Sequence, residues 1–186
     1  MPLVPKYVVD GGGLPQSAEA LLTPTNMTGG QDATLNPPGF VAGGCPYHHQ
    51  RGHLIGNNLG GKDDLRNLVT LTDGTNHPYM FAIERIVKNI VIKTQQNYKY
   101  KVEVMYDEYS PTPNHTGYGA LGNPYCQSPC PSHLFVGLTR VSDNFQMLGD
   151  ANTLAAYPER VWRRLRRTDS GAPARAANRF DLPQQE

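Results

Sequence analysis

The chain has 186 residues, of which 38% are hydrophobic and 18% are charged, and its net charge is only +1. This length is that of one domain with tails, and no apolar run is long enough to cross a bilayer, so a membrane-spanning protein is excluded. The 19 glycines and 16 prolines indicate a globular chain with many connections and few long helices.

Positive charge is concentrated near the C-terminal end. Seven arginines lie there: Arg160, Arg163, Arg164, Arg166, Arg167, Arg175 and Arg179. A local basic face binds phosphate without a high overall charge. We therefore treat Arg163, Arg164, Arg166 and Arg167 as candidate substrate-binding residues, and the alternative is a solvated helix face.

The first residues, MPLVPKYVVDGGGLPQ, lack a basic stretch followed by a continuous apolar core, so we do not expect a signal peptide. Export by a signal-independent route, or origin at the end of a longer polypeptide, is the expectation. The three cysteines, Cys45, Cys126 and Cys130, leave three states open. These are a Cys126–Cys130 disulfide, unpaired thiols, or a structural zinc site completed by a histidine.

The N-terminal part is dense in Gly, Pro, Thr and Asn, which predicts irregular structure over residues 1–40. One short helix is expected within it, at Leu14–Leu22, because its residues have good helix propensity. Two strands follow, at His49–Ile55 and Asn67–Thr72, and the segment Asn57–Asp64 between them is turn-forming. In that turn, Asp63 and Asp64 are either solvated or hold a second cation.

A helix is expected next, with Pro78 in its first turn. Its buried stripe is formed by Tyr79, Ile83, Ile86 and Ile90, which recur at helical spacing. Glu84 lies off that stripe and is free to face a site. The remaining expected elements are a strand at Tyr98–Asp107, a long loop at Ser110–Ser132, an antiparallel strand at His133–Val141, a helix at Thr153–Leu165, and a flexible tail.

The residues that carry chemistry lie in one stretch, from Arg51-Gly52-His53 to Glu84. Phosphodiester hydrolysis needs a base for the attacking water and positive charge for phosphorus and the leaving oxygen. His53 suits the first role because its ordinary pKa lies near working pH. Arg51, on the same face of a strand, could hold a phosphate oxygen. The alternatives are that His53 is a structural histidine of the strand and that Arg51 forms a surface salt bridge.

A cation site is predicted around the helix start. Asn76 offers a neutral oxygen, and Glu84 lies eight residues later, about 12 Å along a helix. Because this gap is too long for both to ligate one ion, we expect Asn76 to bind the metal and Glu84 to hold a metal-bound water, which suits Mg²⁺, or Mn²⁺ in its place. The alternatives are an Asn76 helix cap and a Glu84–Lys88 ion pair. Asn67 would lie near the attacking water or the His53 ring.

These residues resemble the DNA/RNA non-specific endonuclease family of the ββα-metal (His-Me finger) class, and its streptodornase-like branch most of all. The matching features are the Arg-Gly-His strand, Asn67 in RNLVTLT, Asn76 in TNHPYM and Glu84 in FAIERIV. The resemblance covers about residues 44–108.

The resemblance implies a Mg²⁺-dependent nuclease that acts on DNA, with RNA as a second candidate substrate. It also implies His53 as general base, Asn76 as metal ligand, Glu84 acting through water and Arg51 holding phosphate. Two positions depart from the family pattern. Gln50 stands where Asp is frequent, and Lys88 stands where a phosphate-binding Arg is frequent. Lysine keeps the charge but loses the bidentate geometry.

The sequence therefore predicts an α+β fold with a ββα-metal nuclease core on an antiparallel sheet. The expected organisation is an irregular segment at 1–43, a nuclease domain at 44–168 and a flexible tail at 169–186. The predicted setting is a secreted or delivered bacterial toxin, with DNA or RNA as substrate, a neutralising immunity protein as partner and no membrane association. The competing reading is a non-catalytic nucleic-acid-binding module that uses the arginine-rich end.

Overall fold

A computed structural model of the chain describes residues 2–42, 49–71, 73, 75–106, 131, 133–148 and 181–183. The strands are β1 (Lys6–Val9), β2 (Pro15–Leu22), β3 (Gln50–His53), β4 (Leu68–Leu71), β5 (Tyr98–Met105), β6 (His133–Arg140), β7 (Gln146–Leu148) and β8 (Asp181–Pro183). The helical elements are the short turns η1 (Asn57–Leu59), η2 (Leu65–Asn67) and η3 (Thr75–Met80), and the helix α1 (Phe81–Thr94).

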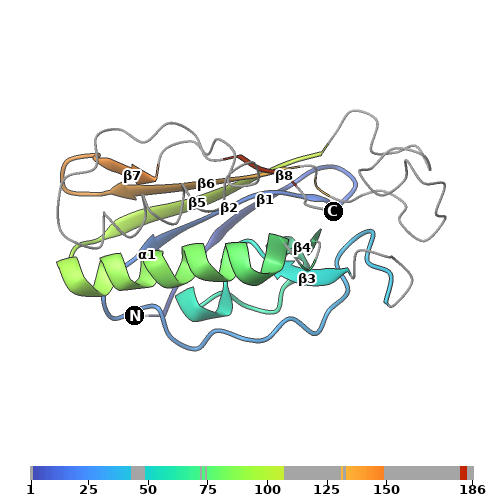
Figure 1. The fold of residues 1–186 in the computed structure, drawn as a ribbon, viewed down its shortest axis with the longest axis horizontal. Coiled ribbons are helices and arrows are strands. Elements are labelled where there is room, and N and C mark those ends of the chain that lie inside the picture. Colours follow the sequence, from blue (N-terminus) through green and yellow to red (C-terminus); the bar gives the residue numbers. More distant parts are fainter. Residues whose placement is uncertain are drawn as a thin grey trace.

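A large antiparallel sheet forms one layer, in the order β1-β2-β5-β6-β7, with β8 also paired to β6. Helix α1 lies along one face of this sheet, and the β3–β4 hairpin lies beside the N-terminal end of α1 (Figure 1). The hairpin and helix form the expected ββα unit, so the predicted α+β fold with an antiparallel sheet is confirmed.

The core lies between the sheet and α1. Alternate residues of β5 face inward, and the register sets Ala20 of β2 and Leu138 of β6 on either side of Tyr100. The small Ala20 of β2 thus accommodates the large Tyr100 ring of β5. From the helix, Ile83, Val87, Ile90 and Val91 complete the same cluster. Ile83 and Ile90 of the predicted stripe are buried, whereas Tyr79 and Ile86 are only partly buried and Val87 is fully buried in place of Ile86.

The prediction of irregular structure with one helix in the first 40 residues is wrong. Residues 6–9 and 15–22 are strands, and β2 pairs with β5 along its length from Ser17 to Leu22. The run Ala18-Glu-Ala-Leu-Leu has helix-forming residues, but Ala18, Ala20 and Leu22 also alternate with a period of two. Pairing with β5 buries that alternating face, and this tertiary contact overrides local propensity.

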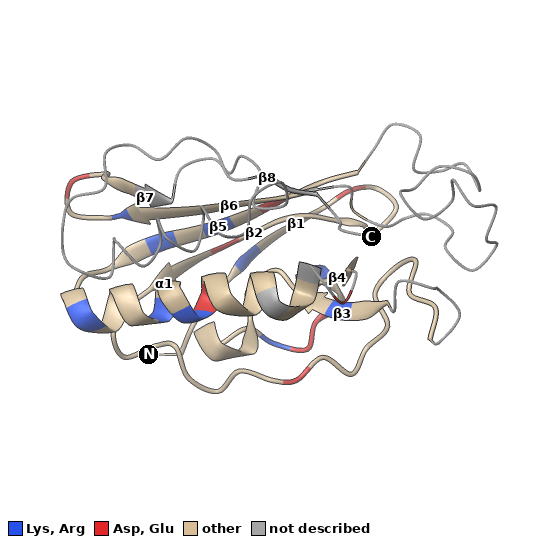
Figure 2. Cartoon of the chain, in the orientation of Figure 1, with Lys and Arg blue, Asp and Glu red and all other residues tan. Residues whose placement is uncertain are grey.

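Several predictions concern residues outside the described part. These are the helix at Thr153–Leu165, most of the loop at Ser110–Ser132, the arginine cluster, the three cysteines and the tail apart from residues 181–183. Those three residues form β8 and pair with β6, so the prediction of a flexible tail is wrong there. Within the described part, Lys and Arg positions are spread over α1, β5 and β3 and do not gather on one face (Figure 2). No helix in that part has both the length and the apolar character needed to cross a membrane.

The β2 assignment predicts opposite outcomes at two neighbouring leucines. Leu22 is fully buried and Leu21 is 51% exposed, because successive strand residues face opposite sides. We expect Leu22→Ala to lower the free energy of unfolding by about 2–5 kcal/mol and Leu21→Ala by less than about 1 kcal/mol. Urea unfolding of both variants measures this difference, and equal losses would contradict the strand.

Candidate active site

The β3–β4 hairpin sets the position of His53. Gly52 pairs with Val69, and His53 pairs with Leu68. A Cβ at Gly52 would overlap the Leu71 side chain, so only glycine fits between Arg51 and His53 at this close approach. Arg51 and His53 lie two residues apart in β3, and both line the pocket described below.

Asn67 closes the loop that joins the two strands. Its carboxamide oxygen accepts a hydrogen bond from the Ile55 amide at 2.9 Å, and its nitrogen donates to the carbonyls of Ile55 and Lys62 at 3.0 Å each. The side chain is fully buried and does not line the pocket. The structure therefore does not bring Asn67 to the attacking water or the pocket; instead, Asn67 fixes the loop that follows His53.

The opposite wall of the site comes from the start of α1. His77 has an extended backbone (φ −129°, ψ 124°), which separates Asn76 from the helix that follows. Met80, the N-cap residue of α1, makes no side-chain capping hydrogen bond, and the reading of Asn76 as a helix cap stays an alternative. The Asn76 carboxamide lines the pocket together with Glu84.

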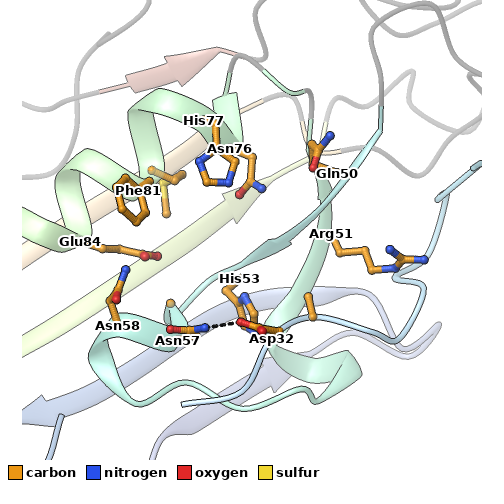
Figure 3. A pocket seen from close by; sticks show the side chains of 13 residues that line it. Asp32, Gln50, Arg51, His53, Asn57, Asn58, Asn76, His77, Phe81 and Glu84 are labelled. Carbon is orange, nitrogen blue, oxygen red and sulfur yellow. Dashed lines mark hydrogen bonds between the residues drawn. The ribbon is translucent and has the colours of Figure 1, made fainter. Parts of the chain in front are cut away.

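The two walls enclose a polar pocket of about 310 Å³. His53 and Asp32 project from one side, and Asn76, Glu84, His77 and Phe81 lie on the other (Figure 3). The remaining lining residues are Ala33, Gln50, Arg51, Gly56, Asn57, Asn58 and Met80. The structure thus places four of the predicted site residues, Arg51, His53, Asn76 and Glu84, around one pocket.

Glu84 is a buried carboxyl at the base of this pocket. It is only 6% exposed, and burial raises its pKa to about 8, against a smaller lowering by a hydrogen bond with the Gly56 backbone. A Cβ on Gly56 would overlap the carboxyl group. No ion pair joins Glu84 to Lys88 among the described residues, so that alternative reading is not supported. The buried Tyr100 hydroxyl is nearby, because the Glu84 charge contributes to the raised Tyr100 pKa.

These donors fit a hard divalent cation. A buried carboxyl without a basic partner is costly as an anion, and a cation in the pocket would offset that cost. Glu84 and Asn76 offer oxygen ligands on one wall, and Asp32, Asn57 and Asn58 offer further side-chain oxygens in the same pocket. No group of three or more His, Cys, Asp or Glu residues that could hold a metal ion is present in the described part of the chain. Mg²⁺ is typically bound by a few protein oxygens and several waters. Zinc sites, in contrast, are typically rich in nitrogen and sulfur ligands.

His53 has the properties of a base. Its Nε2 atom is buried and has no hydrogen-bond partner among the described groups. Burial lowers the pKa of His53, while Asp63, Asp32 and a hydrogen bond with the backbone of Gln31 act in the opposite direction. The imidazole is therefore mainly neutral at pH 7 and can accept a proton.

A segment that we call the strap, residues 29–38, supplies part of the site and was missed by the sequence analysis. Its Gln31 amide donates to the Gly61 carbonyl at 2.9 Å, and the Thr34 and Leu35 amides donate to Asp63 at 3.1 and 3.2 Å. The Asp63 carboxylate is thus a hydrogen-bond acceptor for backbone amides of the strap, and the reading of Asp63 as a second cation site is not supported. Strap residue Asp32 accepts a hydrogen bond from Asn57 and lines the pocket (Figure 3).

Arg51 and Lys88, which were both predicted to contact phosphate, differ in position, because Arg51 lines the pocket and Lys88 does not. The Arg51 Nε donates to Asn36 of the strap at 3.0 Å, and its guanidinium lies 4.5 Å from the centre of the Phe40 ring. Arg51 lines the pocket but leans away from Glu84 (Figure 3). Lys88 is half-buried, one helical turn beyond Glu84, and does not line the pocket. The four candidate arginines, Arg163, Arg164, Arg166 and Arg167, lie outside the described residues.

Comparison with known proteins decides the family. The model of the DNA/RNA non-specific endonuclease family matches residues 4–118. The chain belongs to this family. The match includes β1 and β2, which the resemblance seen in the sequence did not cover. This protein is accordingly an endonuclease that hydrolyses nucleic acid. A search of curated proteins found no match.

Solved structures show the same fold at low identity. NucA from Streptococcus agalactiae without metal has 17% identity and a TM-score of 0.55, over 78% of this chain and 68% of NucA. The magnesium-bound form of NucA gives 17% and 0.54, over 78% and 70%. Sda1 nuclease with bound zinc gives 16% and 0.53, over 77% and 72%.

The role found for Asn67 predicts a loss of stability. Asn67→Ala leaves one amide and two carbonyls of the loop without their partner, and we expect the free energy of unfolding to fall by at least about 2 kcal/mol. Asn67→Asp should also destabilise, because a carboxylate would face two carbonyl oxygens. The exposed Asn97→Ala is the matched control, with an expected change below about 0.5 kcal/mol. Normal stability with lost activity in Asn67→Ala would instead indicate a catalytic role.

The His53 environment predicts the acid limb of the pH profile. Because burial lowers the His53 pKa, the neutral base persists below the ordinary value of 6.5, and kcat/KM should fall only at more acidic pH. Asp32 raises this pKa, so Asp32→Asn should move the acid limb to still lower pH, whereas Asp10→Asn, in a remote exposed turn, should not. An acid limb in Asp32→Asn that stays in place or rises would contradict the assignment.

Proposed function

We propose that this endonuclease cuts phosphodiester bonds of DNA and RNA with a divalent metal ion and with His53 as the general base. The observation that carries the proposal is the shared pocket, which is lined by His53, whose Nε2 has no hydrogen-bond partner among the described groups, and by the oxygen donors Asn76 and Glu84. A phosphodiester between these walls would meet a base on one side and a cation on the other (Figure 3).

The neutral His53 ring takes the proton of the water that attacks phosphorus. As the new P–O bond forms, the bond to the departing sugar oxygen breaks, and that oxygen gains a proton. Asn76 would ligate the ion directly, and Glu84 would hold one of its waters. When bound, the ion supplies positive charge for the phosphate and for the leaving oxygen. Arg51 would hold a phosphate oxygen at the strap side of the pocket.

Mg²⁺ is the proposed ion, with Mn²⁺ as the other candidate, because the donors are all oxygen. The magnesium of the NucA structure is in line with this choice, and the zinc of the Sda1 structure shows that a related fold accepts another ion. Lys88 and the arginines Arg163, Arg164, Arg166 and Arg167 are proposed to hold more distant phosphates. From the sequence, we also propose that the protein is secreted or delivered as a toxin and that a dedicated immunity protein neutralises it.

The test is digestion of plasmid DNA and of RNA with Mg²⁺, Mn²⁺ or EDTA. We expect EDTA to abolish cutting and His53→Ala to lower it at least about 100-fold without loss of stability. Glu84→Gln keeps the size of the side chain but removes its charge, and its residual activity should need a higher Mg²⁺ concentration. Cutting that survives in His53→Ala would disprove the assigned base. Nucleic-acid binding without cutting under any divalent ion would favour the binding-module reading.

A further inference from the structure

The pocket has an exposed aromatic side chain that catalysis does not use. Phe81 is 42% exposed although it lines a mostly polar pocket. It precedes Glu84 by three residues in α1, and residues three apart share one face of a helix. The ring therefore lies one turn from the carboxyl group of Glu84, on the same wall of the pocket (Figure 3).

His77 extends this aromatic surface. Its ring centre lies 5.6 Å from that of Phe81, and the two planes are tilted by 44°. His77 is exposed, lines the same pocket and directly follows Asn76. The two rings thus lie next to both residues of the proposed cation wall.

We propose that Phe81, supported by His77, stacks an unpaired nucleobase next to the scissile phosphate. This inference rests on the proposed function, because it needs the phosphodiester to lie between His53 and the wall formed by Asn76 and Glu84. Every base has a π-face, so stacking on an aromatic ring binds a strand without reading its sequence. Such a subsite therefore fits a nuclease of low sequence preference.

The stacking subsite also sets the substrate class. Bases of a duplex are already paired and stacked, and exposing one of them to an outside ring costs a few kcal/mol. An unpaired base bears no such cost. The subsite therefore favours single-stranded nucleic acid, or locally opened duplex, over intact double helix.

The chain offers a matched control for Phe81. Ile92 is also an exposed apolar residue of α1, at 43%, but it does not line the pocket. It lies eleven residues further along, about three turns or 16 Å at 1.5 Å per residue, close to the same helical face. Removing either side chain exposes similar helix surface, so only an effect on substrate should separate the two.

The experiment uses the full chain and a single-stranded oligonucleotide with one cleavable phosphodiester and nuclease-resistant linkages elsewhere. A second oligonucleotide carries abasic residues on both sides of the cleavable bond, and a third is the normal strand in a duplex. The variants are Phe81→Ala, Phe81→Leu, Phe81→Trp and Ile92→Ala, with kcat/KM as the readout.

We expect Phe81→Ala and Phe81→Leu to lower kcat/KM on the normal single strand by about tenfold or more, the loss of one base stack. Phe81→Trp and Ile92→Ala should retain it. On the abasic strand, wild type and Phe81→Ala should be equally slow, and on the duplex they should differ by less than about threefold.

Equal losses in Phe81→Ala on the normal and abasic strands would overturn the proposal, because no base would then be involved. Full activity of Phe81→Leu would overturn it as well, since leucine offers no π-face. If wild type cuts none of the three substrates with Mg²⁺ or Mn²⁺, the proposed function itself fails, and that outcome is distinct from a variant-specific effect.

Discussion

The contact between the Glu84 carboxyl group and the Gly56 backbone is the constraint on which the site depends. It joins helix α1 to the loop that follows β3, and it holds the carboxyl group almost completely out of water. The absence of a side chain at Gly56 is what allows this approach. The burial that raises the free energy of the Glu84 anion also favours binding of a cation in the pocket. The requirement for glycine at position 56 therefore links the fold to the proposed chemistry.

The strap side of the opposite wall is attached by hydrogen bonds. The strap residues 29–38 contact the loop after η1 through Asp63 and Gly61, and β3 through Arg51. They thereby bring Asp32 and the backbone of Gln31 to His53. Burial is the largest influence on the His53 pKa and lowers it, and Asp63 together with Asp32 and Gln31 of the strap acts in the opposite direction. A segment upstream of His53 thus contributes to its acid–base behaviour, and the large sheet acts mainly as the support for both walls.

The sequence was a good guide where spacing and periodicity act locally. The strands at β4, β5 and β6, the helix after Pro78, and the gathering of Arg51, His53, Asn76 and Glu84 were predicted from alternation, helical periodicity and motif spacing. It failed at β2, because alanine and leucine favour a helix unless a partner strand buries their alternate positions. It also placed Asn67 at the reacting water, since a motif position does not reveal whether a carboxamide faces the backbone or the pocket.

The strap was beyond such reasoning, because it has no regular periodicity and its role arises from contacts with residues 15 to 32 positions away. Its attachment has a further consequence. Most of these bonds involve exposed groups, so the strap can detach in a local opening that costs less free energy than unfolding the sheet. A molecule with its strap released would keep a native core, but Asp32 and the Gln31 backbone would no longer lie beside His53, so the His53 pKa would fall further below its ordinary value while the imidazole stayed on β3.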